Sequence, residues 1–203
     1  MPLLFPVILG SVRRDRQGIK AARYIIDKLE ARGDEPVLVD PCEKQLPLLD
    51  RMYKEYPRGE APLVLGELAD LFRRADGFII VSAEYNQSVP PALKNLLDHF
   101  LEEYFWRPSA ILSYSAGRFG GVRAAVALRT ILSEMGMPSM PSVLSIPTIG
   151  DALNEDGVDR QGGGTLSGRV RMVRESAEGQ TRRRRRALLA RVLMRVAARR
   201  ASS

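Results

Sequence analysis

The sequence predicts a single three-layer α/β domain built on a five-stranded parallel sheet. Short apolar runs alternate along the chain with segments whose apolar residues recur at helical spacing. Helices of roughly 10 to 17 residues separate these runs, so the strands should pair in parallel through right-handed crossovers. A chain of 203 residues is long enough to bury one sizeable core and short enough to form one domain.

Five apolar runs are the predicted strands. They cover residues 3–9, 36–40, 77–83, 108–117 and 140–146. Four segments between them are predicted helices, because each carries an apolar stripe or a helix start or stop signal. They cover residues 18–32, 65–75, 90–105 and 120–136. Gly33 and Gly136 mark helix ends, and Pro90-Pro91 opens the third helix, where first-turn amides lack partners in any case.

The regular pattern fades after Pro147. We place the main domain at residues 1–150, a flexible loop region at 151–180 and an arginine-rich helix at 181–203. Residues 182–200 contain nine arginines and no acids, so the net charge of +7 belongs to this segment and the rest carries about −2.

The sequence also predicts a cytoplasmic location. No apolar run approaches the roughly 18 residues that span a bilayer. The N-terminal run lacks a preceding basic region and a small-residue cleavage site, so we interpret it as a strand rather than a signal peptide. A single cysteine, Cys42, excludes an internal disulfide and suits a reducing compartment.

The first of three strand-to-helix connectors is rich in anion-binding groups. Ligands bind outside the carboxyl ends of parallel strands, where residues 10–18, 83–90 and 115–121 lie. The first connector reads GSVRRDRQG and combines a helix N-terminus with the Ser11 hydroxyl and three arginines, Arg13, Arg14 and Arg16. It matches neither of the standard glycine-rich nucleotide loops. A phosphate site is one interpretation, and a solvated basic loop is the other.

The second connector holds more polar groups than a turn requires. Glu84, Tyr85, Asn86 and Gln87 follow a buried strand and precede the double proline. They could bind the polar edge and face of a flat heterocycle. Alternatively, Glu84 caps the following helix and Tyr85 packs over a neighbour.

The third connector, SYSAGRFGG, is rich in small residues. Ser115, Gly117, Gly120 and Gly121 lack bulk, so their backbone could approach a ligand closely. The alternative is a flexible turn with a helix cap.

Together, GSVRRDRQG, AEYNQSVPPALKNLLD and SAGRFGGVRAAVALR resemble the NAD(P)H-dependent FMN reductase family, a flavodoxin-like group that includes azo, quinone, chromate and ferric reductases. The resemblance covers roughly residues 3–146. Ala83 stands where the family usually has proline. Arg16 and Gly18 replace the serine and asparagine of the commoner first motif, G-S-x-R-x-x-S-x-N.

The resemblance implies a flavodoxin-like sandwich with bound FMN and NADPH or NADH as co-substrate. Three groups of residues would then hold the FMN. The phosphate would lie at Ser11, Arg13, Arg16, Gln17 and Gly18, the ring and ribityl chain at Glu84, Tyr85, Asn86 and Gln87, and the other side of the flavin at Ser115, Gly117, Gly120 and Gly121. The family also implies a homodimer or homotetramer, with residues 90–105 and 120–135 as candidate interface helices.

We hypothesise a two-step hydride transfer, from nicotinamide to flavin and then to a small acceptor such as a flavin, quinone, azo compound or metal ion. This chemistry needs no catalytic side chain and no protein-bound metal. We interpret His99 as structural and Cys42 as incidental. Arg118 is a candidate either for stabilising the anionic reduced flavin or for binding the NADPH phosphate.

Two other functions stay open at this point. One is a flavodoxin-type electron carrier that does not oxidise NAD(P)H, although its phosphate loop is typically threonine-rich. The other is nucleic-acid or anionic-surface binding by the arginine-rich C-terminal segment. We do not expect either nucleic acid or a membrane to be the main partner.

Overall fold

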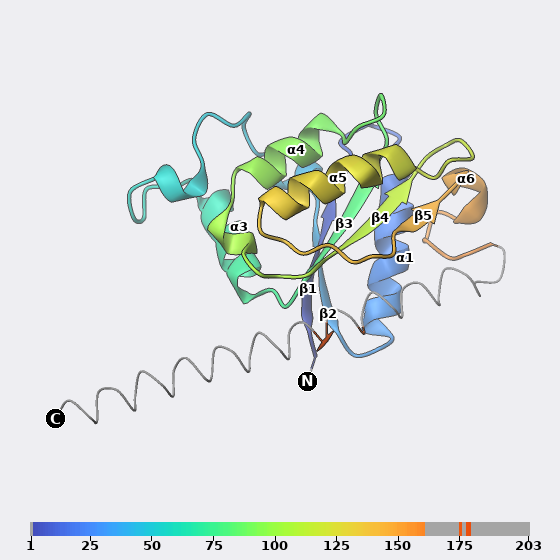
Figure 1. Ribbon diagram of the computed structural model, residues 1–203, viewed down its shortest axis with the longest axis horizontal. Coiled ribbons are helices and arrows are strands. Elements are labelled where there is room, and N and C mark those ends of the chain that lie inside the picture. Colours follow the sequence, from blue (N-terminus) through green and yellow to red (C-terminus); the bar gives the residue numbers. More distant parts are fainter. Residues whose placement is uncertain (1, 161–174, 176–177, 180–203) are drawn as a thin grey trace.

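The computed structural model describes residues 2–160, together with residues 175, 178 and 179. Within this part of the chain, five strands form one parallel sheet in the order β2-β1-β3-β4-β5 (Figure 1). The strands are β1 (Leu4–Leu9), β2 (Glu35–Val39), β3 (Phe78–Ala83), β4 (Ser109–Tyr114) and β5 (Leu144–Ile146). The predicted α/β class with a five-stranded parallel sheet is therefore confirmed.

Helical segments follow each strand. The longer helices are α1 (Gly18–Glu30), α3 (Leu63–Arg74), α4 (Pro91–Asp98) and α5 (Val122–Glu134). The short ones are α2 (Pro41–Lys44), α6 (Ile149–Ala152) and two 3-10 turns, η1 (Tyr53–Glu55) and η2 (Glu102–Tyr104). No element is predicted from sequence between residues 41 and 64, where the structure has α2 and η1.

The sheet has an apolar core on each face, because side chains of a strand alternate between faces. Val7 and Leu9 of β1 pack with α1 and α6, whereas Ile8 packs with α3, α4 and α5 on the opposite face. β3 and β4 show the same alternation. Both cores are almost fully buried, which explains why these strands read in the sequence as continuous apolar runs.

The predicted helix over residues 90–105 is wrong in its second half. α4 ends at Asp98, and Leu101 leaves helical geometry with φ −146° and ψ −67°. This change of direction places Phe100 and Tyr104 against Phe72, with ring centroids 5.0 and 5.4 Å from it. Burying these two large rings in the core stabilises the fold more than two further helical turns exposed to water would.

Residues 151–160 are the first part of the segment that was expected to be a flexible loop region. In the structure they pack against the core and α1. Leu153 is fully buried, and Gly157 lies so close to α1 that a Cβ would be 2.7 Å from the Lys20 carbonyl oxygen. Lys20 also forms an ion pair of 2.7 Å with Glu155. The predicted arginine-rich helix at 181–203 lies outside the described residues.

Candidate functional site

The strand order reverses between β1 and β3, because the chain adds β2 on one side of β1 and then β3 on the other, and this opens a crevice at the carboxyl edge of the sheet. From β1 the chain passes to α1 on one face, and from β3 it passes to α4 on the other. A cavity of about 330 Å³ lies at this point. Its lining residues come from all three polar connectors and from α6. They are Ser11, Arg13, Asp15, Arg16, Gln17, Ala83, Glu84, Tyr85, Tyr114, Ser115, Ala116 and Ile149.

The N-terminus of α1 faces this crevice without a capping side chain. Gln17 stands at the N-cap position and forms no side-chain cap hydrogen bond, and the first turn contains no acid. The helix dipole therefore favours an anion here, where the Tyr114 hydroxyl already lies against the Gly18 amide. Gly18 begins the helix, and a Cβ there would lie 2.3 Å from the Tyr114 hydroxyl. Only glycine allows the tyrosine to lie over the helix start.

Arg16 is held by a buried acid that the sequence did not single out. Asp40, which follows β2, accepts hydrogen bonds from both terminal nitrogens of Arg16 and from the Cys42 amide. Arg16 also donates to the Ser11 carbonyl oxygen (3.2 Å). Burial acts to lower the pKa of the Arg16 guanidinium, but the hydrogen bond and charge of Asp40 raise it above its ordinary value on balance. Arg16 thus fastens the first connector to β2.

Arg13 is exposed beside the same crevice. Within the described ranges, no carboxylate forms an ion pair with it. Since Asp40 already compensates the charge of Arg16, Arg13 is the arginine of this connector that is better placed to meet an added negative charge.

Hydroxyl groups meet at the base of the crevice. The Ser11 and Tyr85 hydroxyls share a hydrogen bond of 2.9 Å, although the residues are 74 positions apart. Tyr114 lies beside them. Burial and the neighbouring Tyr85 raise the pKa of Tyr114 to about 12, against smaller opposing effects of Ser11 and Arg16. Tyr114 therefore keeps its proton at neutral pH and can donate it in a hydrogen bond to an anion.

The second connector is a tight two-residue turn. The amides and carbonyl oxygens of Tyr85 and Ser88 bond each other reciprocally at 2.9 Å, and Asn86 and Gln87 have φ values of 48° and 66°. Such left-handed geometry is tolerated by asparagine but costs about 1 kcal/mol or more for a residue such as glutamine. Neither Asn86 nor Gln87 lines the cavity, whereas Glu84 and Tyr85 of the same connector do.

Glu84 caps a helix, but not the helix that follows it. Its carboxylate accepts from the Arg123 amide (3.0 Å) and from Arg123 Nη1 (3.1 Å) at the start of α5. The expected alternative, a cap on α4, is wrong, because Pro90 stands at the N-cap position of that helix and no side chain caps it. Glu84 instead ties the second connector to the third.

The glycines of the third connector serve different purposes. A Cβ at Gly117 would meet nothing within 4 Å, so this position is open. Gly120 and Gly121 have φ values of 62° and 76°, and added Cβ atoms would lie 3.1 Å from the Pro147 nitrogen and 2.7 Å from the Tyr114 carbonyl oxygen, respectively. In the structure these two glycines let the turn pack onto β4 and β5.

The crevice brings together seven of the thirteen residues that the sequence suggested for cofactor binding. They are Ser11, Arg13, Arg16, Gln17, Glu84, Tyr85 and Ser115. The other six lie in the same connectors without lining the cavity: Gly18, Asn86, Gln87, Gly117, Gly120 and Gly121. Sequence reasoning missed Tyr114 and Asp40. Asp40 is the last residue of the predicted strand 36–40, which is a signal that could have found it. Tyr114 is the last residue of β4, but the predicted strand ran on to residue 117 and hid this position.

The single histidine and the single cysteine of the chain do not line the crevice. His99 is fully buried, and its Nε2 lies 3.1 Å from the Pro47 carbonyl oxygen. Cys42 is exposed in α2. Among the described residues, His, Cys, Asp and Glu side chains form no group that could hold a metal ion.

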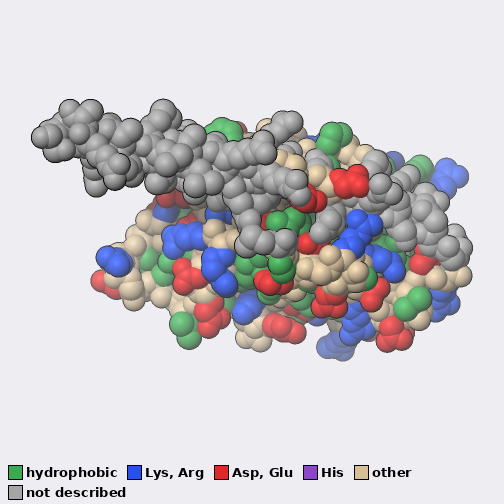
Figure 2. Space-filling model, turned by 90° about the horizontal axis from the view of Figure 1, so that it is seen from below, with side chains coloured by type: hydrophobic (Ala, Val, Ile, Leu, Met, Phe, Trp, Pro, Cys, Tyr) green, Lys and Arg blue, Asp and Glu red, His purple; other side chains and the backbone are tan. Residues whose placement is uncertain are grey.

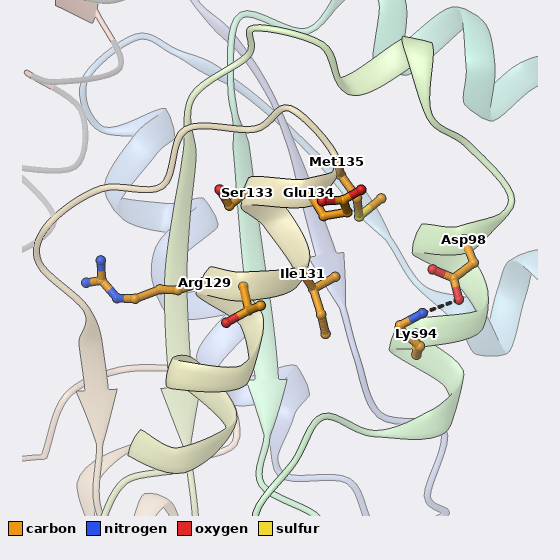
Figure 3. Close-up of a pocket in the computed structure, with 8 residues that line it drawn as sticks. Lys94, Asp98, Arg129, Ile131, Ser133, Glu134 and Met135 are labelled. Carbon is orange, nitrogen blue, oxygen red and sulfur yellow. Dashed lines mark hydrogen bonds and ion pairs between the residues drawn. The ribbon is translucent and has the colours of Figure 1, made fainter.

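A larger cavity, of about 740 Å³, lies between α4 and α5, but it is a shallow surface groove. Figure 3 shows that Lys94 and Asp98 pair with each other on α4, while Arg129 of α5 points to the opposite side. Arg129 donates to the Pro141 carbonyl oxygen. The groove contains no strand-end connector, so we assign the ligand site to the smaller crevice.

A parallel sheet in this strand order, with a polar crevice at the point where the order reverses, is typical of the flavodoxin-like class. The family model described as NADPH-dependent FMN reductase matches residues 5–151. The chain therefore belongs to this family. Its membership confirms the predicted oxidoreductase class with FMN and NAD(P)H, and it does not favour the electron-carrier alternative.

Individual relatives agree with this assignment. A quinone reductase of Pseudomonas putida strain KT2440 is 31% identical over 147 residues, which cover 66% of this chain and 72% of that protein. An NADPH azoreductase of Bacillus sp. strain OY1-2 is 28% identical over 136 residues, with 66% and 71% covered.

Solved structures share the fold. FerB, a flavoenzyme NAD(P)H:(acceptor) oxidoreductase from Paracoccus denitrificans, has a TM-score of 0.71 at 22% identity and covers 88% of this chain and 98% of its own. An archaeal flavodoxin has a TM-score of 0.54 at 13% identity, with 88% and 99% covered.

In the part of the chain that the structure describes, no helix is both long and apolar enough to cross a membrane.

Proposed function

We propose that the crevice at the β1/β3 reversal binds FMN and that the protein uses it to reduce a small acceptor with NAD(P)H. The observation that carries this proposal is the meeting of an uncapped helix N-terminus with the Ser11, Tyr85 and Tyr114 hydroxyls in one cavity. Hydroxyl donors around the positive end of a helix dipole stabilise the negative charge of a bound phosphate.

The residues present fit the two ends of FMN. Ser11, Arg13 and the first amides of α1 would hold the phosphate, with Arg16 and Gln17 completing the loop. The backbone of the turn at residues 84–87 would contact the ring, and the open position at Gly117 leaves room on its other side. Gly120 and Gly121 would act indirectly, by fixing the shape of the third connector.

Bound FMN would supply the redox chemistry, which is hydride acceptance from nicotinamide and delivery to an acceptor. The chain's own contribution would be to position the flavin and its substrates and to exclude water from them. Tyr114 keeps a neutral hydroxyl against the phosphate end, Asp40 holds Arg16, and Glu84 holds the second and third connectors together. No side chain needs to exchange a proton with the substrate in this scheme.

The acceptor is proposed to be a small molecule, with quinones and azo compounds as the first classes to test, since relatives carry those names. On the face shown in Figure 2, acidic and basic side chains are interspersed. Such mixed charge differs from the continuous basic surface that binds nucleic-acid phosphates.

We also propose a homodimer or homotetramer in the cytoplasm. Val122 and Val126 lie four residues apart on α5 and are 43% and 65% exposed, and the groove between α4 and α5 runs along the same helix. Exposed apolar side chains on one helix face favour a contact between copies. Sedimentation of the purified protein would measure the assembly, and a monomer at micromolar concentration would contradict this part of the proposal.

The test of the central activity is anaerobic reduction of the FMN-loaded protein. We expect NADPH or NADH to bleach the bound flavin directly, without a partner reductase, and a quinone to restore the colour. A flavin that binds but stays oxidised with both nucleotides would contradict the proposed activity. Deletion of residues 182–203 should leave FMN binding and reduction intact, since the crevice is built by residues 11–149.

A further inference from the structure

An exposed tryptophan precedes β4 at the amino end of the sheet. Trp106, the single tryptophan of the chain, is 77% exposed, and its neighbour Phe105 is 39% exposed. The Trp106 backbone has a φ of 63°, a left-handed conformation that is unfavourable for a bulky residue. Burial of the indole does not offset this strain, because most of the ring lies in water. Contacts of the neighbouring backbone must therefore maintain the conformation.

The residues on both sides of Trp106 supply these contacts. The Trp106 amide donates to the Gly136 carbonyl oxygen (2.9 Å), just beyond the end of α5. Arg107 donates to the Phe105 carbonyl oxygen (3.3 Å), and a Cβ added to Gly136 would lie 3.0 Å from the Phe105 ring. The backbone thus presents a large exposed aromatic side chain from a fixed position, and tryptophan is the residue type most often found as an anchor in binding surfaces.

The surroundings of Trp106 favour a cationic partner. The carboxyl end of α5 carries the negative end of the helix dipole, and its last turn contains no basic side chain. Glu134 stands in this turn, two residues before Gly136, and the Glu102 carbonyl oxygen accepts from the Phe105 amide (3.3 Å). Both glutamate side chains are exposed, and neither forms an ion pair with a described residue. An indole face with two carboxylates suits guanidinium groups.

We propose that the arginine-rich segment at residues 182–200 docks on the patch formed by Glu102, Phe105, Trp106 and Glu134 of its own chain. This segment contains nine arginines and no acids, whereas the rest of the chain carries about −2. A guanidinium group stacks on an aromatic face and also pairs with carboxylates, so arginine suits both parts of the patch. Docking would keep these arginines from binding nucleic-acid phosphates without specificity.

The chain is long enough for this contact. The continuous described chain ends at Arg160, whose amide donates to the Ala152 carbonyl oxygen (3.0 Å) at the end of α6. Residues 161–181 could span up to roughly 70 Å from there. The sheet measures only about 20 Å from its carboxyl edge to its amino edge, since its longest strands have 6 residues.

The patch is separate from the contact proposed between copies of the chain. Val122 begins α5, a helix of 13 residues and about 20 Å, whereas Glu134 ends it. The two surfaces can therefore be occupied at the same time. The docking also involves no residue of the crevice, so it stands or falls independently of FMN binding.

Trp106 reports the contact directly, because the chain has no other tryptophan. The experiment measures acrylamide quenching of its fluorescence in the full-length protein as purified. Replacing the arginines at residues 182–186 by glutamine should raise the quenching constant about twofold, since the segment no longer covers the indole. Glu102→Gln combined with Glu134→Gln should raise it as well. Glu30→Gln, an exposed acid in the last turn of α1, is the matched control and should leave it unchanged.

A second measurement needs no variant and so does not depend on how the substituted proteins fold. Raising the salt from about 0.05 M to about 0.5 M should bring the wild-type quenching constant toward that of the arginine variant, because salt screens surface charges. Equal quenching in the wild type and the arginine variant, or no response of the wild type to salt, would overturn the inference. Quenching that falls as the protein concentration rises would also overturn it, because a second copy would then cover the indole.

Discussion

The two ends of the sheet both bury charged side chains, but they use them differently. At the amino end, an acid or arginine stands just before each of three strands and bonds the backbone. Asp34 and Asp76 accept from the Leu3 and Leu4 amides (3.3 and 3.0 Å), and Arg107 donates to three carbonyl oxygens, those of Arg73, Ala75 and Phe105.

At the carboxyl end, an acid stands directly after each of β2 and β3 and bonds an arginine from another part of the chain. Arg16 pairs with Asp40, and Glu84 pairs with Arg123. The difference teaches where ligand chemistry can reside. The charged side chains at the amino end form hydrogen bonds with backbone groups and so stabilise the fold. At the carboxyl end, the Ser11, Tyr85 and Tyr114 hydroxyls and Arg13 line a cavity. Mutations at the two ends should therefore separate stability from FMN affinity.

Arg107→Met tests the amino end and should have the largest effect. It leaves three carbonyl oxygens without their donor, one of them at 3.0 Å from Arg107 Nε. Truncating a buried, fully bonded charge costs about 3 kcal/mol in the free energy of unfolding. Urea denaturation would measure this loss, with Arg32→Met as the exposed control. At a temperature where the variant is still folded, its FMN affinity should equal that of the wild type. A changed affinity would contradict the proposal that the amino end affects stability and not FMN binding.

Gly121→Ala should destabilise the carboxyl end itself by about 2 kcal/mol, because glycine is required at φ 76° and a Cβ would lie 2.7 Å from the Tyr114 carbonyl oxygen. Gly117→Ala is the matched control in the same turn, since its Cβ would meet no atom within 4 Å. Thermal unfolding of the two variants gives the comparison. Equal melting temperatures would contradict the packing role assigned to Gly121.

Ser11→Ala should show the opposite pattern to Arg107→Met. The variant removes a hydroxyl that faces the crevice and would bond the FMN phosphate. Loss of one charge-assisted hydrogen bond should weaken FMN binding about tenfold. Its free energy of unfolding without FMN should fall by only about 1 kcal/mol, the value of the buried hydrogen bond to Tyr85, which is well below the loss in Arg107→Met. Fluorescence titration with FMN measures the first quantity, and an unchanged Kd would place the phosphate elsewhere.

Tyr114→Phe gives the smallest effect on the free energy of unfolding, and this effect depends on pH. The pKa of Tyr114 is raised to about 12 in the folded protein, above about 10 in the unfolded chain. The unfolded state therefore releases this proton first, so the stabilisation is complete below about pH 10 and declines as pH rises toward 12.

By about pH 11 the wild type should lose about 1 kcal/mol that Tyr114→Phe does not lose. Urea denaturation at about pH 9 and about pH 11 would measure the difference between the two proteins. An identical decline in both would show that Tyr114 does not titrate in this way.

Patterns within short segments predicted much of this molecule. The strands, most helices and the three connectors follow from apolar runs, glycines and prolines, because those signals are local. The failures involve residues far apart in sequence. Arg16 meets Asp40 24 positions later, and Glu84 meets Arg123 39 positions later. The end of α4 depends on Phe72, which no pattern near residue 100 reveals.

The turn at Asn86-Gln87 was also beyond local prediction, because neither residue is a glycine that would signal a positive φ. Its polar side chains suggested a binding loop, yet in the structure the two residues form a strained turn and do not line the cavity.

The most direct test is a crystal structure of the protein with FMN. We predict that the phosphate lies within hydrogen-bonding distance of Ser11 Oγ and the first amides of α1, with the ring between the turns at residues 84–87 and 115–117. Flavin bound in the groove between α4 and α5, or at the amino end of the sheet, would contradict the division of roles between the two ends.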